Sequence, residues 1–163
     1  MKKFLVILFL LVSTLSYSQE TTTFILVRHA EKASDGTSDP ALTDAGIARA
    51  NNLFALLKQA EITAIYSTNY KRTKMTVAAL AKAKEMEVTT YDPKKLKEFS
   101  LDLLKENAGG TVVISGHSNT TPTLANLLLG AETFKQFEDS DYGNLIIIST
   151  SSSASPKLLH LKY

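Results

Sequence analysis

Two histidines each follow an apolar run, at the point where the chain turns polar. The run 24–27 leads into Arg28 and His29, and the run 112–114 leads three residues later to His117. Open α/β sheets place their ligand crevice at the carboxyl ends of the strands, so histidines that follow two strands can converge there. We therefore predict that His29 and His117 belong to one active site.

The residue types around these histidines suit chemistry on a phosphate group. A neutral imidazole nitrogen can attack as a nucleophile, and the planar fork of arginine matches the oxygens of a phosphoryl group. Phosphoryl transfer is catalysed mainly by positioning and by positive hydrogen-bond donors around the transferring group. Arg28 adjoins His29, and Arg72 follows a second apolar run. The alternative for each arginine is an ordinary surface ion pair.

A metal site is a competing interpretation of the same region. Two histidines and the carboxylate of Glu31 could in principle bind zinc. The neighbouring arginines would repel a cation, so the sequence predicts a site without metal or other cofactor.

The chain alternates short apolar runs with longer amphipathic stretches. This order is typical of crossover units around a largely parallel sheet. We expect strands at 23–28, 62–66, 87–91, 111–115 and 145–150, and an edge strand at 157–162. The spacing predicts helices at 43–57, at about 70–84, from 96 through 103 to an end before Gly109, and from 121 to near 130.

The first and last of these helices carry specific signals. Thr43 can cap the first helix, whereas Gly46 in its first turn is locally unfavourable and would be explained by close approach of another backbone. Thr121 is the expected cap of the last helix. The apolar face of the first helix is predicted to hold Ile47, Ala50, Phe54 and Leu57.

Composition and the amino-terminal segment bound the class of protein. The 163 residues, 44% hydrophobic and 21% charged, fit one globular domain with a core of its own. Residues 1–18 combine two lysines, an apolar stretch and small residues before position 19, as in a cleaved signal peptide. The apolar stretch is shorter than the roughly 20 residues that a membrane-spanning helix needs. We expect a signal peptide at 1–18 and a periplasmic or secreted domain at 19–163, with no stable membrane insertion after cleavage.

Charge and cysteine content exclude several functions. Without residues 1–18, the chain keeps 16 of its 18 basic residues and all 16 acidic residues, so the mature protein is neutral. A neutral balance gives no basic footprint for nucleic acid. The sequence contains no cysteine, which excludes disulfides and thiolate metal sites.

Four motifs follow one another along the chain. They are Leu26-Val27-Arg28-His29-Ala30-Glu31, Leu42-Thr43-Asp44-Ala45-Gly46, Ile65-Tyr66-Ser67-Thr68 with Arg72-Thr73, and Gly116-His117-Ser118. In type and order they resemble the histidine phosphatase superfamily, in its phosphoglycerate mutase-like branch, over nearly all of residues 23–150. The resemblance implies an α/β fold, a three-layer α/β/α sandwich around a largely parallel sheet. It also implies that His29 is phosphorylated in turnover, that Arg28 and Arg72 clamp the phosphate, and that His117 is a second electrostatic partner.

Less specific signals mark the remaining candidates. Ser118 precedes an expected helix start and can contribute to substrate binding through its backbone or hydroxyl, or take part only in loop contacts. The leaving group needs a proton, and the candidate donors are Glu98, Asp92 and Glu31. Glu98 has the leucine-x-glutamate spacing of some relatives, Asp92 follows a strand end, and Glu31 lies beside the nucleophile.

The predicted function is that of an exported, metal-independent phosphomonoesterase that works through a phosphohistidine on His29. A phosphomutase or phosphotransferase is less favoured, because the chain lacks long insertions that would enclose a bisphosphate and exclude water. A non-catalytic phosphate-binding module would need the same arginines and is the other alternative. The expected partner is a small-molecule or envelope phosphoester, with no nucleic acid, and the oligomeric state is left open.

Overall fold

The computed structural model describes residues 20–163, and the signal peptide expected at 1–18 lies outside the described residues. The elements are β1 (Thr22–Arg28), α1 (Asp44–Leu57), β2 (Ala64–Thr68), α2 (Lys71–Ala83), β3 (Val88–Tyr91), α3 (Leu96–Glu106), β4 (Thr111–Gly116), α4 (Thr120–Leu129), β5 (Asn144–Ser151) and β6 (Ala154–Lys162). Within this part of the chain, none of the helices has both the length and the apolar character that a membrane crossing requires.

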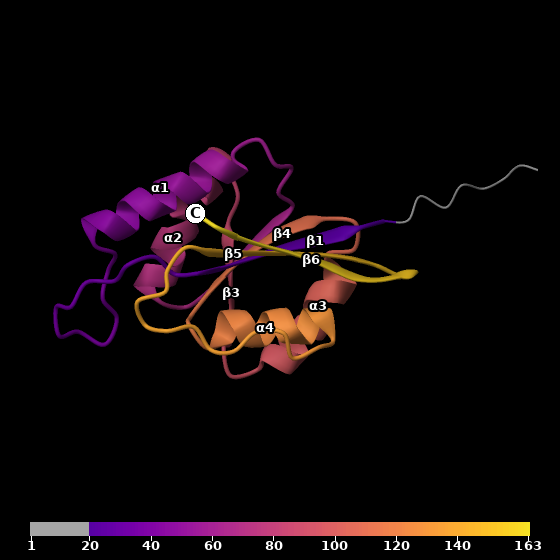
Figure 1. Cartoon of the computed structure of the whole chain (residues 1–163). Coiled ribbons are helices and arrows are strands. Elements are labelled where there is room, and N and C mark those ends of the chain that lie inside the picture. The colour runs from indigo at the N-terminus through magenta and orange to yellow at the C-terminus, as the bar shows by residue number, and fades with distance from the viewer. Residues whose placement is uncertain (1–19) are drawn as a thin grey trace, which may run out of the picture.

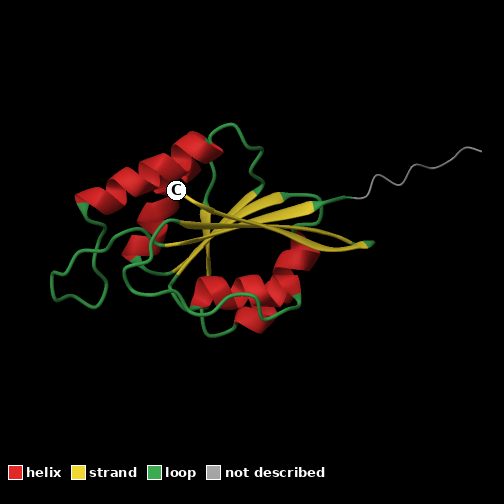
Figure 2. Cartoon of the chain, viewed as in Figure 1, coloured by secondary structure: helices red, strands yellow, loops and turns green. Residues whose placement is uncertain are grey.

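The strands form one sheet in the order β3-β2-β4-β1-β5-β6. The first four of these are parallel to one another, whereas β5 and β6 pair antiparallel at the other side. Helices α1 and α2 cover one face of the sheet, and α3 and α4 cover the other, as Figures 1 and 2 show. The predicted three-layer sandwich around a largely parallel sheet is confirmed.

Strand β1 is covered by helices on both faces of the sheet, which explains the continuous apolar run in its sequence. Phe24 and Leu26 belong to a buried cluster with residues of α3 and α4, whereas Ile25 and Val27 belong to a cluster with residues of α1 and α2. A strand covered on both faces buries every side chain, which gives a run of apolar residues in place of an alternating pattern. Each fully buried side chain of this kind contributes about 1.5–3 kcal/mol.

Strand register brings the carboxyl ends of β1, β2 and β4 to one edge of the sheet. Arg28 at the end of β1 pairs with Gly116 at the end of β4, and Ser115 of β4 pairs with Ser67 of β2. The residues that follow these three strands therefore emerge side by side.

Helix α1 confirms two of its predicted features. Thr43 is the N-cap, and its side-chain oxygen accepts a hydrogen bond from the backbone N–H of Gly46 at 3.1 Å. A Cβ atom at position 46 would lie 2.3 Å from the carbonyl oxygen of Glu31, so the predicted close approach of another backbone is real. The glycine lets α1 begin directly against the segment that follows the first histidine.

The predicted apolar face of α1 is partly wrong. Ile47 is 44% exposed, and Phe54 is only half-buried. The inward residues are Gly46, Ala50, Leu53 and Leu57. Because Gly46 must face the Glu31 carbonyl, the helix is rotated so that position 47 points outward.

The predicted cap of α4 is also wrong. The N-cap residue is Asn119, and Thr121 lies inside the helix, where its hydroxyl donates to the carbonyl of Val27 at 3.3 Å. The hydroxyl of Thr120 accepts a hydrogen bond from the backbone N–H of His117 at 2.8 Å. The N-cap lies two residues earlier than predicted, because the hydroxyls of Thr120 and Thr121 bond to backbone groups at and just beyond the strand ends.

Candidate active site

A cavity of about 400 Å³ lies at the edge where β1, β2 and β4 end, and Arg28, His29, Arg72 and His117 all line it. The backbone N–H of His29 donates to the carbonyl of Gly116 at 2.9 Å, which continues the pairing of β1 with β4. The rings of His29 and His117 meet edge to face, with centroids 5.5 Å apart. The structure thus brings together the four residues singled out in the sequence.

His29 is buried and held in one orientation. Its Nδ1 lies 2.8 Å from the carbonyl oxygen of Ala30, to which it donates, and this leaves the lone pair on Nε2. Burial lowers the pKa of His29 from 6.5 to about 4, against the hydrogen bond to Ala30, which raises it. The charges of Arg28, His117 and Arg72 lower the pKa further. The imidazole is therefore neutral at neutral pH, the form in which it can act as a nucleophile.

A threonine pair orients His117. The Oγ1 of Thr68 lies 2.9 Å from His117 Nε2 and donates to Thr73 Oγ1 at 3.0 Å. Thr73 donates its own proton to a backbone carbonyl, so Thr68 accepts from the Nε2–H of His117. Burial, then the charges of Arg72 and Arg28, lower the pKa of His117 to about 4.

Arg28 is fixed by main-chain carbonyls of the loop that precedes β5. Its side chain is 2% exposed, and Nη1 donates to the carbonyls of Glu138 at 2.7 Å and Asp141 at 3.1 Å. Nη2 donates to the carbonyl of Asp139 at 3.1 Å, and the ring of Tyr142 lies 4.2 Å from the guanidinium carbon. The buried Nε finds no hydrogen-bond partner among the described residues. The Nε–H of this guanidinium is therefore left without an acceptor among these residues.

Arg72 offers two more such donors. Its Nε and Nη1 are buried and lack a hydrogen-bond partner within residues 20–163. Nη1 lies 3.6 Å from Asp39 Oδ1, an ion pair too long for a hydrogen bond, and the guanidinium stacks on Tyr70 at 4.5 Å. A buried donor without a partner costs about 1–3 kcal/mol. An anion with several acceptor oxygens would satisfy the donors of both arginines.

Ser118 lines the same cavity, but the three expected proton donors do not. Glu31 points toward α1, where Arg49 Nη2 and Nε donate to its carboxylate at 2.7 and 3.0 Å. The hydrogen bonds from Arg49 hold the pKa of Glu31 below its usual range. An acid held in its ionised form cannot supply a proton at neutral pH.

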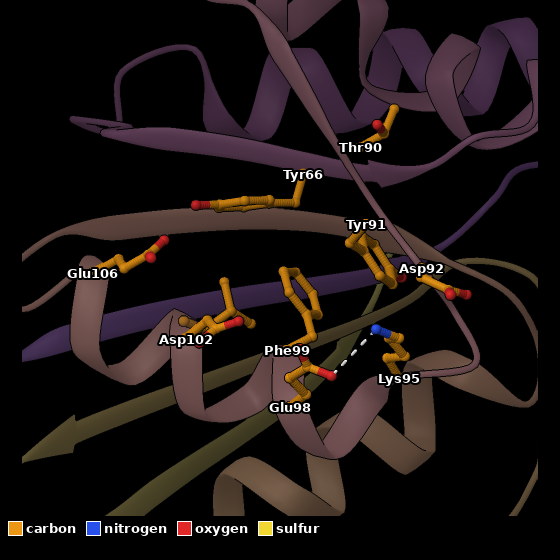
Figure 3. A pocket seen from close by; sticks show the side chains of 10 residues that line it. Tyr66, Thr90, Tyr91, Asp92, Lys95, Glu98, Phe99, Asp102 and Glu106 are labelled. Carbon is orange, nitrogen blue, oxygen red and sulfur yellow. Dashed lines mark ion pairs between the residues drawn. The ribbon is translucent and has the colours of Figure 1, made fainter.

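Asp92 and Glu98 line a separate cavity of about 270 Å³ beside α3. Figure 3 shows Glu98 turned toward Lys95, with Glu98 Oε2 3.6 Å from Lys95 Nζ. The leucine-x-glutamate spacing therefore places Glu98 on the exposed side of a helix and not beside His29.

Several residues of the site were not among those predicted from the sequence. Thr68 ends the motif at 65–68, and Tyr70 lies two residues before Arg72. Both could have been identified by their position in the sequence close to a predicted site residue. Asp139 lines the cavity and Tyr142 stacks on Arg28, but both lie in the irregular segment before β5, where no periodic pattern marks them. Lysines 32 and 94 add further positive charge to the cavity wall.

Within the part of the chain that the structure describes, no three His, Cys, Asp or Glu side chains gather closely enough to hold a metal ion. The site instead presents neutral imidazoles and guanidinium donors, an arrangement that fits an oxyanion.

Comparisons with known proteins agree with this geometry. The model of the histidine phosphatase superfamily (branch 1) matches residues 24–102, which contain three of the four motifs. No curated protein matches the chain.

Three solved structures illustrate the similarity of fold. Phosphoserine phosphatase of Entamoeba histolytica, in complex with 3-phosphoglyceric acid, is 20% identical, with 87% of this chain and 97% of that chain covered and a TM-score of 0.70. Mycobacterial glucosyl-3-phosphoglycerate phosphatase is 12% identical, with 85% and 97% covered and a TM-score of 0.71. The protein histidine phosphatase SixA, complexed with tungstate, is 14% identical, with 86% and 96% covered and a TM-score of 0.68. The chain thus matches the model of the histidine phosphatase superfamily, branch 1, over residues 24–102, and it shares its fold with phosphatases of known structure.

Proposed function

We propose that the protein is an exported phosphomonoesterase that hydrolyses phosphate esters through a phosphohistidine on His29, without metal or other cofactor. One observation carries the proposal. A neutral, buried imidazole with a free Nε2 shares a cavity with Arg28 and Arg72, and three buried guanidinium nitrogens of these arginines have no partner among residues 20–163.

In the first step, the Nε2 lone pair of His29 attacks phosphorus. The bond from phosphorus to the leaving oxygen breaks, and its electron pair stays on that oxygen, which then takes a proton from solvent water. The Nδ1–H bond to the Ala30 carbonyl stabilises the positive charge that develops on the ring. The guanidinium groups of Arg28 and Arg72 donate to the phosphoryl oxygens, where preorganised donors lower the barrier most. The ring of His117, whose Nε2–H is bound to Thr68, lines the same cavity.

In the second step, water attacks the phosphohistidine and the bond from phosphorus to Nε2 breaks. Positive charge from Arg28 and Arg72 takes the part that a metal ion plays in other phosphatases. Hydrolysis is favoured over phosphotransfer because Asp139, on the cavity wall, is fully exposed, so water has access to the site. The segment 1–18 supports export.

The decisive experiment is capture of the covalent intermediate. Brief mixing with a labelled phosphoester and an alkaline quench should leave acid-labile label on the wild-type protein. His29→Ala should abolish label and turnover. His160→Ala is the matched control, because His160 lies on β6 and bonds to Asn144 outside the cavity.

Other outcomes separate the alternatives. Phosphate binding without label or hydrolysis across a broad phosphoester panel would establish a binding module. Faster transfer of label to an added alcohol than to water would establish a phosphotransferase or mutase. Activity lost on chelation and restored by zinc or magnesium would contradict metal independence.

Export is tested separately. Mass spectrometry of the protein from the native cell envelope should find an amino terminus at or near Gln19. A soluble form that retains Met1 in the cytoplasm would contradict export.

A further inference from the structure

We propose that Asp139 is the catalytic base that takes a proton from the attacking water when the phosphohistidine on His29 is hydrolysed. The inference rests on the proposed function and adds a residue that the four motifs do not contain. It assigns a role to the irregular segment between α4 and β5.

The hydrolytic step requires a proton acceptor. As the water oxygen bonds to phosphorus, the bond from phosphorus to Nε2 breaks and its electron pair returns to the imidazole. The water must lose one proton, which a carboxylate on the open side of the cavity can accept and later release to solvent. A positioned general base typically contributes about 10²- to 10⁴-fold to such a step.

Asp139 has the right place for this role. It lines the cavity together with His29, and its Oδ1 lies 3.9 Å from Nη2 of Arg28. The side chain of Arg28 is 2% exposed, whereas that of Asp139 is fully exposed. The carboxylate therefore lies at the solvent side of the phosphate clamp, where water enters.

The backbone fixes this position. The carbonyl of Asp139 accepts from Arg28 Nη2 at 3.1 Å, and the carbonyls of Glu138 and Asp141 accept from Nη1. The guanidinium that binds these carbonyls also lines the cavity, and its Nε has no partner among the described residues. These contacts thus hold the backbone of Asp139, from which the carboxylate projects, beside the phosphate-binding arginine.

No other described carboxylate lines this cavity. Glu31 is bound by Arg49, and Glu98 lies with Asp92 in the separate cavity of Figure 3. Glu138 precedes Asp139 in the same loop but does not line the cavity.

The test uses Asp139→Asn, with Glu138→Gln as the matched control. The substrate is 4-nitrophenyl phosphate, whose leaving group needs no proton, so release of 4-nitrophenolate in a rapid-mixing burst reports formation of the phosphohistidine. Decay of the isolated labelled phosphoenzyme in buffer reports its hydrolysis. Thermal unfolding with inorganic phosphate reports whether the anion still binds.

In Asp139→Asn, formation should stay within about twofold of wild type, while decay should slow by about 10²-fold or more. Label should therefore accumulate on the variant during turnover. Glu138→Gln should match wild type in both steps. Phosphate should still raise the melting temperature of Asp139→Asn, because the main-chain contacts to Arg28 do not depend on the side chain.

Two outcomes would overturn the inference. Equal decay in wild type and Asp139→Asn would show that water needs no help from this carboxylate. Loss of both phosphohistidine formation and phosphate binding in the variant would show that Asp139 only supports Arg28. A wild-type protein that takes no label would refute the proposed function itself, and the inference with it.

Discussion

Replacing Arg72 by methionine should stabilise the protein in the absence of ligand and remove most of its affinity for phosphate. Methionine keeps an apolar stem over Tyr70 but has no N–H donors. The wild-type side chain buries two donors, Nε and Nη1, without a partner among the described residues. The opposite signs of the two effects distinguish a ligand-binding arginine from a structural one.

The magnitudes follow from the contacts. Two unpaired buried donors cost at least about 2 kcal/mol together, at about 1–3 kcal/mol each. Against this, the variant loses a stacking contact of about 0.5–1 kcal/mol and a half-exposed ion pair with Asp39 of about 0–1 kcal/mol. A net gain of about 1 kcal/mol corresponds to a melting temperature higher by about 2–4 °C.

The loss of affinity should be larger. Two charge-assisted hydrogen bonds to a phosphate oxygen contribute about 1.5–3 kcal/mol each, so the dissociation constant of inorganic phosphate should rise about 10²- to 10⁴-fold. Arg72→Lys keeps the charge but not the planar fork, so its dissociation constant for phosphate should lie between those of wild type and Arg72→Met.

Thermal unfolding with and without phosphate measures both effects in one experiment. Wild type should gain stability as phosphate is added, because a ligand that binds only the folded state stabilises it by mass action. Arg72→Met should start higher and respond little. A variant that starts lower and still responds to phosphate would refute the reasoning and leave Arg72 as an ordinary ion-pair residue.

Three further predictions test other contacts. Gly46→Ala should lower the free energy of unfolding, measured with urea, by about 1 kcal/mol or more. The clash with the Glu31 carbonyl outweighs a helix-propensity gain of about 1 kcal/mol. An increase in stability would contradict the observed close approach. Stability should also fall as pH drops from about 6.5 to 4, because the folded-state pKa of His29 is about 4 and the unfolded chain takes up the proton first. This loss should be about 3 kcal/mol at most for His29, and it should be smaller in His29→Gln. Thr68→Val removes the acceptor for His117 Nε2 and should lower kcat by up to about tenfold. Circular dichroism and the melting temperature should show an intact fold. An unchanged kcat would show that the His117 ring does not need the hydrogen bond to Thr68.

The parts of the fold and site that follow from the sequence depend on local patterns. Buried parallel strands require continuous apolar runs, and 24–27 and 112–114 have them, so the meeting of His29 with His117 could be predicted. The close approach of another backbone at Gly46 could be predicted, because glycine is unfavourable in the first turn of a helix unless a side chain would clash there.

The errors arose where three-dimensional contacts override local patterns. Ile47 has helical spacing but points outward, because the approach of Gly46 to Glu31 sets the rotation of α1. Glu98 has the leucine-x-glutamate spacing of a proton donor. The direction in which its side chain faces depends on how α3 is placed after β3, which the spacing does not show. Asp139 could not be found at all, since it lies in a segment without periodicity and is placed by its backbone.

The support of Arg28 has a consequence for which changes the loop before β5 can tolerate. All three groups that accept its hydrogen bonds at 138, 139 and 141 are main-chain carbonyls, which every amino acid possesses. Replacing side chains at these positions should therefore leave the arginine in place. Inserting or deleting a single residue would shift the carbonyls out of reach and free the guanidinium. The orientation of this arginine is encoded in the length of the loop, and much less in its composition.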